Sequence, residues 1–226
     1  MTNKKTNLKL LVVTLATTFG LAASAAAQSA NVAVPVPTTA PAGDQGLLGS
    51  AYTGLSGNYF KLNGEVAGVT PSVARGFTFD YNQPLTDGLD LTVNYDWTRA
   101  RAFAFKTTEQ QVGVVTTGFL RESWGKPYLS AGLDWDHRRG NFAITGNSLG
   151  LLAGTGVEFQ VAPAFAVTPF VNFVRETHFN QNEVDYGAKA TYRFDHNWSV
   201  TAKAEYHDIS HSSDRMEYAL GVNYHF

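Results

Sequence analysis

Large apolar residues alternate with polar or small residues along the end of the chain. Tyr218, Leu220, Val222, Tyr224 and Phe226 occupy every second position, and polar or small residues fill the positions between them. Successive side chains of a strand point to opposite faces, so a period of two predicts a β-strand with one apolar and one polar face. The last residue falls on the apolar face.

The same period recurs upstream, and no helical period competes with it. Alternating runs lie at 77–82, 89–97, 133–136, 149–161, 184–195 and 200–207. Short turn-like links lie at 84–88, 123–126, 162–164 and 195–197. Longer, more polar links lie at 64–71, 98–108, 137–147, 178–182 and 209–214. Short and long links alternate, as they do in up-and-down barrels with tight turns at one end and longer loops at the other.

The links predict an all-β, closed antiparallel up-and-down barrel of ten strands over 51–226. Four short turns and five longer loops join ten strands, which is an even number. The first strand, near 51–63, does not keep its apolar residues on one face. A bulge in that strand, or a barrel of eight strands, is therefore the alternative.

The aromatic residues indicate what the apolar face meets. Tyr81, Trp97, Trp135, Trp198 and Tyr224 lie near the ends of predicted strands. Barrels that span a membrane carry aromatic girdles at both interfaces, whereas a soluble barrel or sandwich packs its apolar face inside. So many aromatic residues would overfill the lumen of a small barrel. The pattern therefore favours a transmembrane β-barrel.

The start of the chain predicts export. Lysines form a basic region, 10–23 are largely apolar, and alanines at 25–27 offer a cleavage site before Gln28, so 1–27 is expected to be a signal peptide. The proline-rich segment 28–50 shows neither period and is expected to be a flexible periplasmic lead-in.

Composition narrows the classes of function. The 226 residues include no cysteine, which excludes a lipoprotein anchor and structural disulfides. The formal net charge is -2 and the basic residues form no run, so we expect no nucleic-acid partner.

The final strand carries the most specific motif of the chain, a glycine followed by aromatic residues three and five positions later. These are Gly221, Tyr224 and Phe226. In this motif, and in its strands over 49–226, the chain resembles small bacterial outer-membrane β-barrels of the OmpA/OmpX type in the porin-like superfamily. The family usually has a polar residue two positions before the glycine, where this chain has Ala219. The resemblance implies an outer-membrane location and insertion by the outer-membrane assembly machinery, which reads this strand as its signal.

Alternation also predicts which charges point into the lumen. They are Asp90, Asp134, Asp136, Glu158, Lys189, Arg193, Lys203, Glu205 and Glu217. Charges removed from bulk water must be paired or hydrated. They could form an ion-pair network that fills the barrel, or they could line a narrow polar pore.

Several arginines fall in or beside the predicted outer loops. They are Arg99, Arg101, Arg138, Arg139, Arg175 and Arg215. Guanidinium groups bind phosphates in a bidentate manner. Contacts with lipopolysaccharide phosphates are therefore one hypothesis, and ordinary solvated loop charge is the other.

The region from His207 to Glu217 is the candidate for chemistry. It contains His207, Asp208, Ser210, His211, Ser213 and Glu217. Serine hydrolases need a base within hydrogen-bond reach of the hydroxyl, but no family-specific motif surrounds these residues. The case for a metal site here is equally weak, because the spacing of these residues fits an ordinary loop as well.

We therefore expect an integral outer-membrane barrel that is structural or porin-like, with no catalytic residues, metal or cofactor. Outer-membrane lipid, lipopolysaccharide and the assembly machinery are the expected partners, and the barrel is expected to be a monomer. The alternative is a lipid A-modifying hydrolase or a protease that uses the His207–Glu217 region. A receptor or adhesin role would need larger loops than these.

Overall fold

We describe residues 46–63, 73–102, 105–140, 145–210 and 214–226 of the computed structural model of the protein. The predicted signal peptide at 1–27 and the first part of the lead-in, 28–45, lie outside these residues. The described residues contain no helix that is long and apolar enough to cross a membrane.

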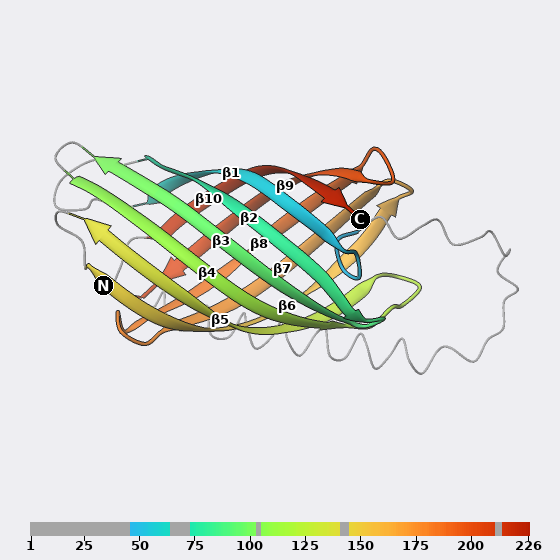
Figure 1. Cartoon of the computed structure of the whole chain (residues 1–226), viewed down its shortest axis with the longest axis horizontal. Helices are drawn as coiled ribbons and strands as arrows, with labels where there is room; N and C mark the ends of the chain where they lie inside the picture. Colours follow the sequence, from blue (N-terminus) through green and yellow to red (C-terminus); the bar gives the residue numbers. More distant parts are fainter. Residues whose placement is uncertain (1–45, 64–72, 103–104, 141–144, 211–213) are drawn as a thin grey trace, which may run out of the picture. The chain divides into compact units, whose positions relative to one another are not determined.

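The chain forms ten strands in one closed barrel (Figure 1). They are β1 Tyr52–Asn63, β2 Val73–Thr86, β3 Leu89–Ala102, β4 Phe105–Phe119, β5 Lys126–Gly140, β6 Gly146–Ala162, β7 Phe165–Glu176, β8 Gln181–Arg193, β9 Trp198–Ile209 and β10 Asp214–His225. Each strand pairs antiparallel with its neighbours in sequence, and β1 pairs with β10 to close the sheet. The prediction of a ten-strand up-and-down barrel is confirmed, and the alternative of eight strands is wrong.

The structure explains why the apolar residues of β1 do not keep to one face. β1 pairs with both β10 and β2 without a shift in register, so it contains no bulge. Its apolar residues lie on both faces, because Tyr52 and Phe60 are buried inside while Leu55 and Tyr59 are exposed outside. Tyr52 packs against His225 of β10, with the ring centroids 5.8 Å apart.

Burial in this barrel is inside out compared with a soluble protein. The exposed large side chains include Leu129, which is 71% exposed, and Leu220, which is 68% exposed. The buried polar side chains include Asp136, which is 0% exposed. A closed barrel satisfies its backbone hydrogen bonds within the sheet, and a continuous apolar outer wall is what lipid requires. The barrel therefore has a lipid-facing outer wall and a polar lumen.

The two ends of the barrel differ, and we name them by their connections. The turn end carries the short links, such as Asp87–Gly88 between β2 and β3, at the positions the sequence predicted. At the opposite loop end, β3 and β4 extend over most of the predicted loop 98–108, where Arg101 is in register with Lys106. Beyond the lipid band both faces of a strand are polar, so hydropathy alternation stops before the hydrogen-bonded ladder does.

Candidate functional site

The charged inner wall of the barrel is the candidate site. The structure places all nine predicted lumen residues on this face. Six are buried: Asp90, Asp134, Asp136, Glu158, Glu205 and Glu217. Lys189, Arg193 and Lys203 are half-buried. Their role stays a prediction. Their contacts lie at successive levels of the barrel, near the loop end, in the middle of the lumen and at the turn end.

Near the loop end, Arg138 joins strands from across one side of the lumen. Its guanidinium lies 2.7 Å from Asp136, 3.1 Å from Glu109 and 2.6 Å from Glu176. It also donates a hydrogen bond to Gln181 (2.8 Å). We call these five residues the Arg138 cluster. The ring of Phe179 lies 4.5 Å from the guanidinium carbon, so an aromatic face covers the charge.

His207 is the centre of a second cluster at the same end. Its Nδ1 lies 2.7 Å from Glu183 and 2.8 Å from Asp185, and its Nε2 lies 3.2 Å from Glu217. Arg215 donates to the same Glu183 oxygen at 3.2 Å. We call these five residues the His207 cluster. With both ring nitrogens among carboxylates, the imidazole serves as a hub of hydrogen bonds.

A contact across the lumen links the two clusters. Glu109 of β4 belongs to the Arg138 cluster, and its other carboxylate oxygen lies 3.8 Å from Arg215 of β10. β4 and β10 are not neighbours in the sheet, because β1, β2 and β3 separate them on the shorter path around the barrel. Charged side chains thus cross the lumen near the loop end.

The middle of the lumen is also cross-linked by polar groups. Lys203 lies 2.7 Å from Glu205 and 3.0 Å from Glu217, which connects it to the His207 cluster. On the opposite wall, Asp96 accepts hydrogen bonds from Thr78 and from Asn94 (2.8 Å). These groups are ionic or hydrogen-bonded, as buried polar groups must be.

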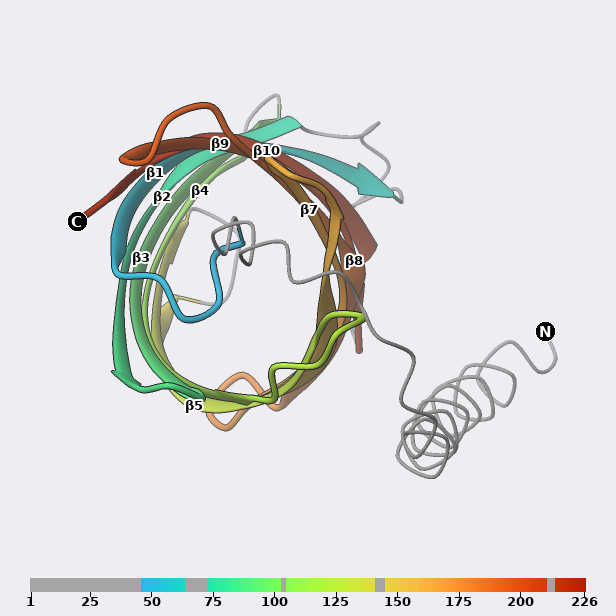
Figure 2. The ribbon, with the colours of Figure 1, turned by 90° about the vertical axis from the view of Figure 1, so that its right-hand side faces the viewer.

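The segment that precedes β1 enters the barrel at the turn end. Figure 2 shows this segment, in blue, lying inside the ring of strands. We call residues 46–50 the mouth segment. The backbone N–H of Leu47 donates to Glu158 (2.8 Å), and that of Gly49 donates to Asp90 (2.8 Å). The prediction that 28–50 is a flexible lead-in is therefore wrong for 46–50.

Two further side chains hold the mouth segment from its carbonyl side. Lys126 donates to the carbonyl of Leu48 (2.7 Å) and forms an ion pair with Glu158 (2.9 Å). Asn82 donates to the carbonyl of Ser50 (2.8 Å). The inner wall therefore supplies both acceptors and donors to this short stretch of backbone, which satisfies its peptide groups away from bulk water.

A cavity of about 190 Å³ lies in the lumen between these levels. Its lining contains eight carboxylates, from Asp96, Glu109, Asp134, Glu176, Glu183, Asp185, Glu205 and Glu217. The cationic side chains in the lining are Lys203, Arg215 and His207. The cavity is therefore strongly acidic.

The six arginines that were predicted to contact lipopolysaccharide do not all face the same side of the barrel wall. All six lie in strands, and none lies in a loop. Arg138 and Arg215 point inward and are held in ion pairs, so the hypothesis is wrong for these two. Arg99, Arg139 and Arg175 alternate with inward-facing neighbours and point outward. The side chain of Arg101 lies outside the described residues.

The region considered for catalysis is divided by the barrel wall. His207 and Glu217 meet inside the lumen, as part of the His207 cluster. Ser210 instead accepts a hydrogen bond from the backbone N–H of Asn182 (2.7 Å), and Asp208 follows the outward positions of β9. His211 and Ser213 lie outside the described residues. The partners of His207 are thus carboxylates.

Sequence reasoning missed much of the network at the loop end. Glu109, Glu176 and Glu183 lie beside segments predicted to be loops, and the mouth segment was assigned to the lead-in. Counting by twos would have found several of the side chains. Asp134 and Asp136 lead to Arg138, and Glu217 leads back to Arg215. The signal in the sequence is parity, meaning that every second residue of a strand faces the lumen, and this rule continues beyond the point where apolar and polar residues stop alternating.

Two residues of the predicted assembly signal, Gly221 and Tyr224, lie on opposite faces of β10, and the third, Phe226, follows the strand. A side chain in place of Gly221 would put its Cβ 2.7 Å from Ser56 of β1, so the glycine permits close packing at the closing pair of strands. Tyr224 packs against Trp198 with ring centroids 5.0 Å apart, and Phe226 stacks on Tyr81 at 6.1 Å. These rings belong to an aromatic group on the outer wall near the turn end. Their role in assembly stays a prediction.

Comparison with known proteins supports the fold. No protein-family profile matches the chain, and no curated protein sequence matches it. The translocator domain of autotransporter NalP from Neisseria meningitidis is similar over 80% of this chain and 91% of that chain, with 12% identity and a TM-score of 0.51. Neisserial surface protein A is similar over 77% and 96%, with 16% identity and a TM-score of 0.41. The attachment invasion locus protein Ail of Yersinia pestis is similar over 78% and 99%, with 14% identity and a TM-score of 0.38.

The closed sheet, the apolar outer wall and the charged lumen together define the class of protein. They are the features of an integral outer-membrane β-barrel. This chain is a small ten-strand barrel of that class.

Proposed function

We propose that the protein is a structural outer-membrane barrel without chemistry of its own. Its lumen is normally closed, and it resembles a porin only in that small cations can enter it. The observation that carries this proposal is the filling of the lumen at both ends. The mouth segment lies in the turn end, held by Glu158 and Asp90. Ion pairs that include Glu109 and Arg215 cross the lumen near the loop end.

The charge of the remaining cavity limits what can enter it. The cavity measures about 190 Å³ and lies between the charged side chains of the inner wall. Since carboxylates outnumber cationic groups in the lining, any ion that enters is expected to be a cation.

The contacts of His207 support the absence of catalysis. A general base needs a free nitrogen directed at a nucleophile. Both nitrogens of His207 are instead engaged by the carboxylates of Glu183, Asp185 and Glu217. The imidazole is therefore better placed to hold strands together than to transfer protons.

Conductance of the refolded, full-length protein in planar bilayers tests the proposal. Wild-type protein is expected to be silent or to show rare, small, cation-selective events. Replacing both anchors, Glu158→Ala with Asp90→Ala, should release the mouth segment and raise the frequency of open events. Asp195→Asn, in an exposed turn at the same end, is the matched control and should behave like wild type.

Two results would overturn the proposal. One is frequent anion-selective current through the wild-type protein, and the other is uptake of sugars by vesicles that contain it. Heat-modifiable migration on gels establishes that each variant has folded, so a silent double variant would also count against the role of the mouth segment.

A further inference from the structure

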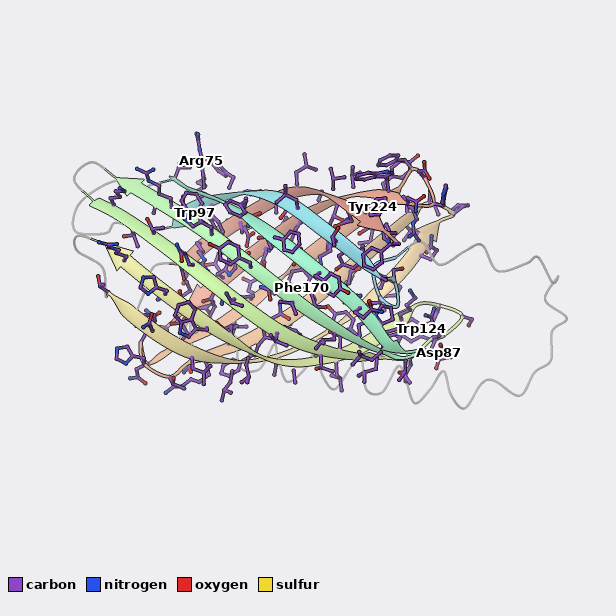
Figure 3. All side chains as sticks on the ribbon, viewed as in Figure 1. Arg75, Asp87, Trp97, Trp124, Phe170 and Tyr224 are labelled. Carbon is purple, nitrogen blue, oxygen red and sulfur yellow. The ribbon has the colours of Figure 1, made fainter. Side chains whose placement is uncertain are left out.

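Two arginines face each other on the outer wall near the loop end. Arg75 of β2 and Arg99 of β3 are directly opposite in register. Both alternate with inward-facing neighbours, so their side chains leave the same outer face. Figure 3 shows Arg75 projecting from the barrel near Trp97, at the end opposite Asp87 and Trp124. Like charges placed directly opposite each other destabilise a sheet, so this pair needs an explanation.

No carboxylate of the described residues contacts this pair. Within the ranges that the structure describes, neither guanidinium has a hydrogen bond or an ion pair with a carboxylate. The inward-facing arginines differ in this respect, because Arg138 has three carboxylate partners and Arg215 has two. The chain thus pairs its lumen arginines and leaves Arg75 and Arg99 available to an external anion.

A hollow beside the two side chains gives a ligand space to enter. It has a volume of about 320 Å³ and is lined by Val73, Arg75, Trp97 and Arg99. Trp97 stacks on Phe77, with ring centroids 5.7 Å apart. The two arginines therefore lie between Val73, toward the loop end, and the aromatic ring of Trp97, toward the membrane.

The position of the hollow matches the boundary of the lipid band. On β3 the outward positions are apolar from Leu91 through Tyr95 to Trp97, and the next outward residue is Arg99. Tryptophan marks the membrane–water interface. A strand advances about 3.3 Å per residue, so Arg99 lies about 7 Å farther along the strand than Trp97, on the side of the headgroups.

The charge around the loop-end rim is uneven. On the neighbouring strands, exposed outward positions hold Lys61, Lys106 and Arg139. The outward rim positions of β9 and β10 instead hold Asp208 and Asp214. The side of the barrel formed by β1–β5 is therefore the side that attracts anions.

We propose that Arg75 and Arg99 form a binding site for the phosphate of an outer-leaflet lipid, and that the ligand is the phosphorylated headgroup of lipopolysaccharide. The two guanidiniums bind the phosphate oxygens, and Trp97, on the membrane side of the arginines, contacts the apolar part of the lipid. The loop end of such barrels faces outward, where this lipid is found. The site depends on the membrane placement of the barrel and not on whether the lumen conducts.

Binding of lipid A to the folded, full-length protein in zwitterionic detergent tests this site by native mass spectrometry. Wild-type protein is expected to retain bisphosphorylated lipid A and to lose it when the phosphates are removed. Arg75→Gln with Arg99→Gln should weaken binding by about tenfold or more, since charge-assisted hydrogen bonds are lost. Arg175→Gln is the control, because this outward arginine on β7 already donates to Asn180 and Asn182.

Three outcomes would overturn the proposal. They are equal binding by the double variant, equal binding of dephosphorylated lipid A, and equal binding of phosphatidylglycerol, which would mean that any anionic lipid suffices. If the double variant does not fold, Arg99→Lys keeps the charge and removes the bidentate geometry. That variant should then bind more weakly than wild type, and unchanged binding would again contradict the site.

Discussion

Replacement of Arg138 by methionine tests how much the lumen network stabilises the barrel. Methionine keeps most of the apolar length of the side chain and removes the guanidinium, together with its contact with the ring of Phe179. The change leaves Glu109, Asp136 and Glu176 without the guanidinium that lies within 3.1 Å of all three. Three carboxylates would then face each other in a poorly hydrated space.

The size of the effect follows from burial. Removing one partner of a buried ion pair costs about 3–5 kcal/mol, because the other charge is left unpaired. The Arg138 side chain is 17% exposed, so solvent screens part of the loss. We therefore expect the lower limit, about 3 kcal/mol, or about a hundredfold in the folding equilibrium constant. Glu176→Gln in the same background should restore part of this stability, because it removes one unpaired charge.

Urea titration of the refolded protein in lipid vesicles measures the free energy of unfolding. Arg139→Met is the matched control, since this adjacent residue is exposed on the outer face and its loss should cost less than about 0.5 kcal/mol. If Arg138→Met also stays within about 1 kcal/mol of wild type, the cluster does not stabilise the barrel and the reasoning fails.

Two further changes test packing and hydrogen bonding on the sheet by the same titration. Gly187→Ala should cost about 1–3 kcal/mol, because the new Cβ would lie 2.2 Å from the carbonyl oxygen of Ala204. Gly57→Ala is the control and should be tolerated, because nothing lies within 4 Å of its Cβ position. Equal stability of the two variants would contradict this reasoning. Tyr206→Phe should cost about 1 kcal/mol, because the hydrogen bond to Asp214 (2.8 Å) is lost. Tyr186→Phe, in the neighbouring ring 5.2 Å away, is the comparison, and a larger cost for this variant than for Tyr206→Phe would count against the bond.

The strands and turns could be predicted because their signals are local. A period of two and the residues of a tight turn, such as Asp87–Gly88, need no knowledge of distant parts of the chain. The first strand shows the limit of this approach. Its pattern is irregular because Tyr52 and Phe60 find partners inside the lumen, which depends on how the barrel closes.

The lumen network could be predicted only in part. The nine predicted charges follow from parity, and so do Arg138 and Arg215, but parity does not tell which carboxylates of other strands these arginines meet. The mouth segment leaves even less trace in the sequence. Its contacts come from backbone N–H groups, and the Leu47–Glu158 bond joins residues 111 positions apart. No residue type marks such a bond.

The contact between Glu109 and Arg215 has a consequence for how the barrel forms. Their strands, β4 and β10, come together only when the sheet has closed, so an open sheet would lack this contact and would expose the charged inner wall to lipid. Exposed charges are costly in lipid. The charges therefore favour closure of the sheet, which removes the inner wall from lipid and brings Arg215 to a carboxylate of β4.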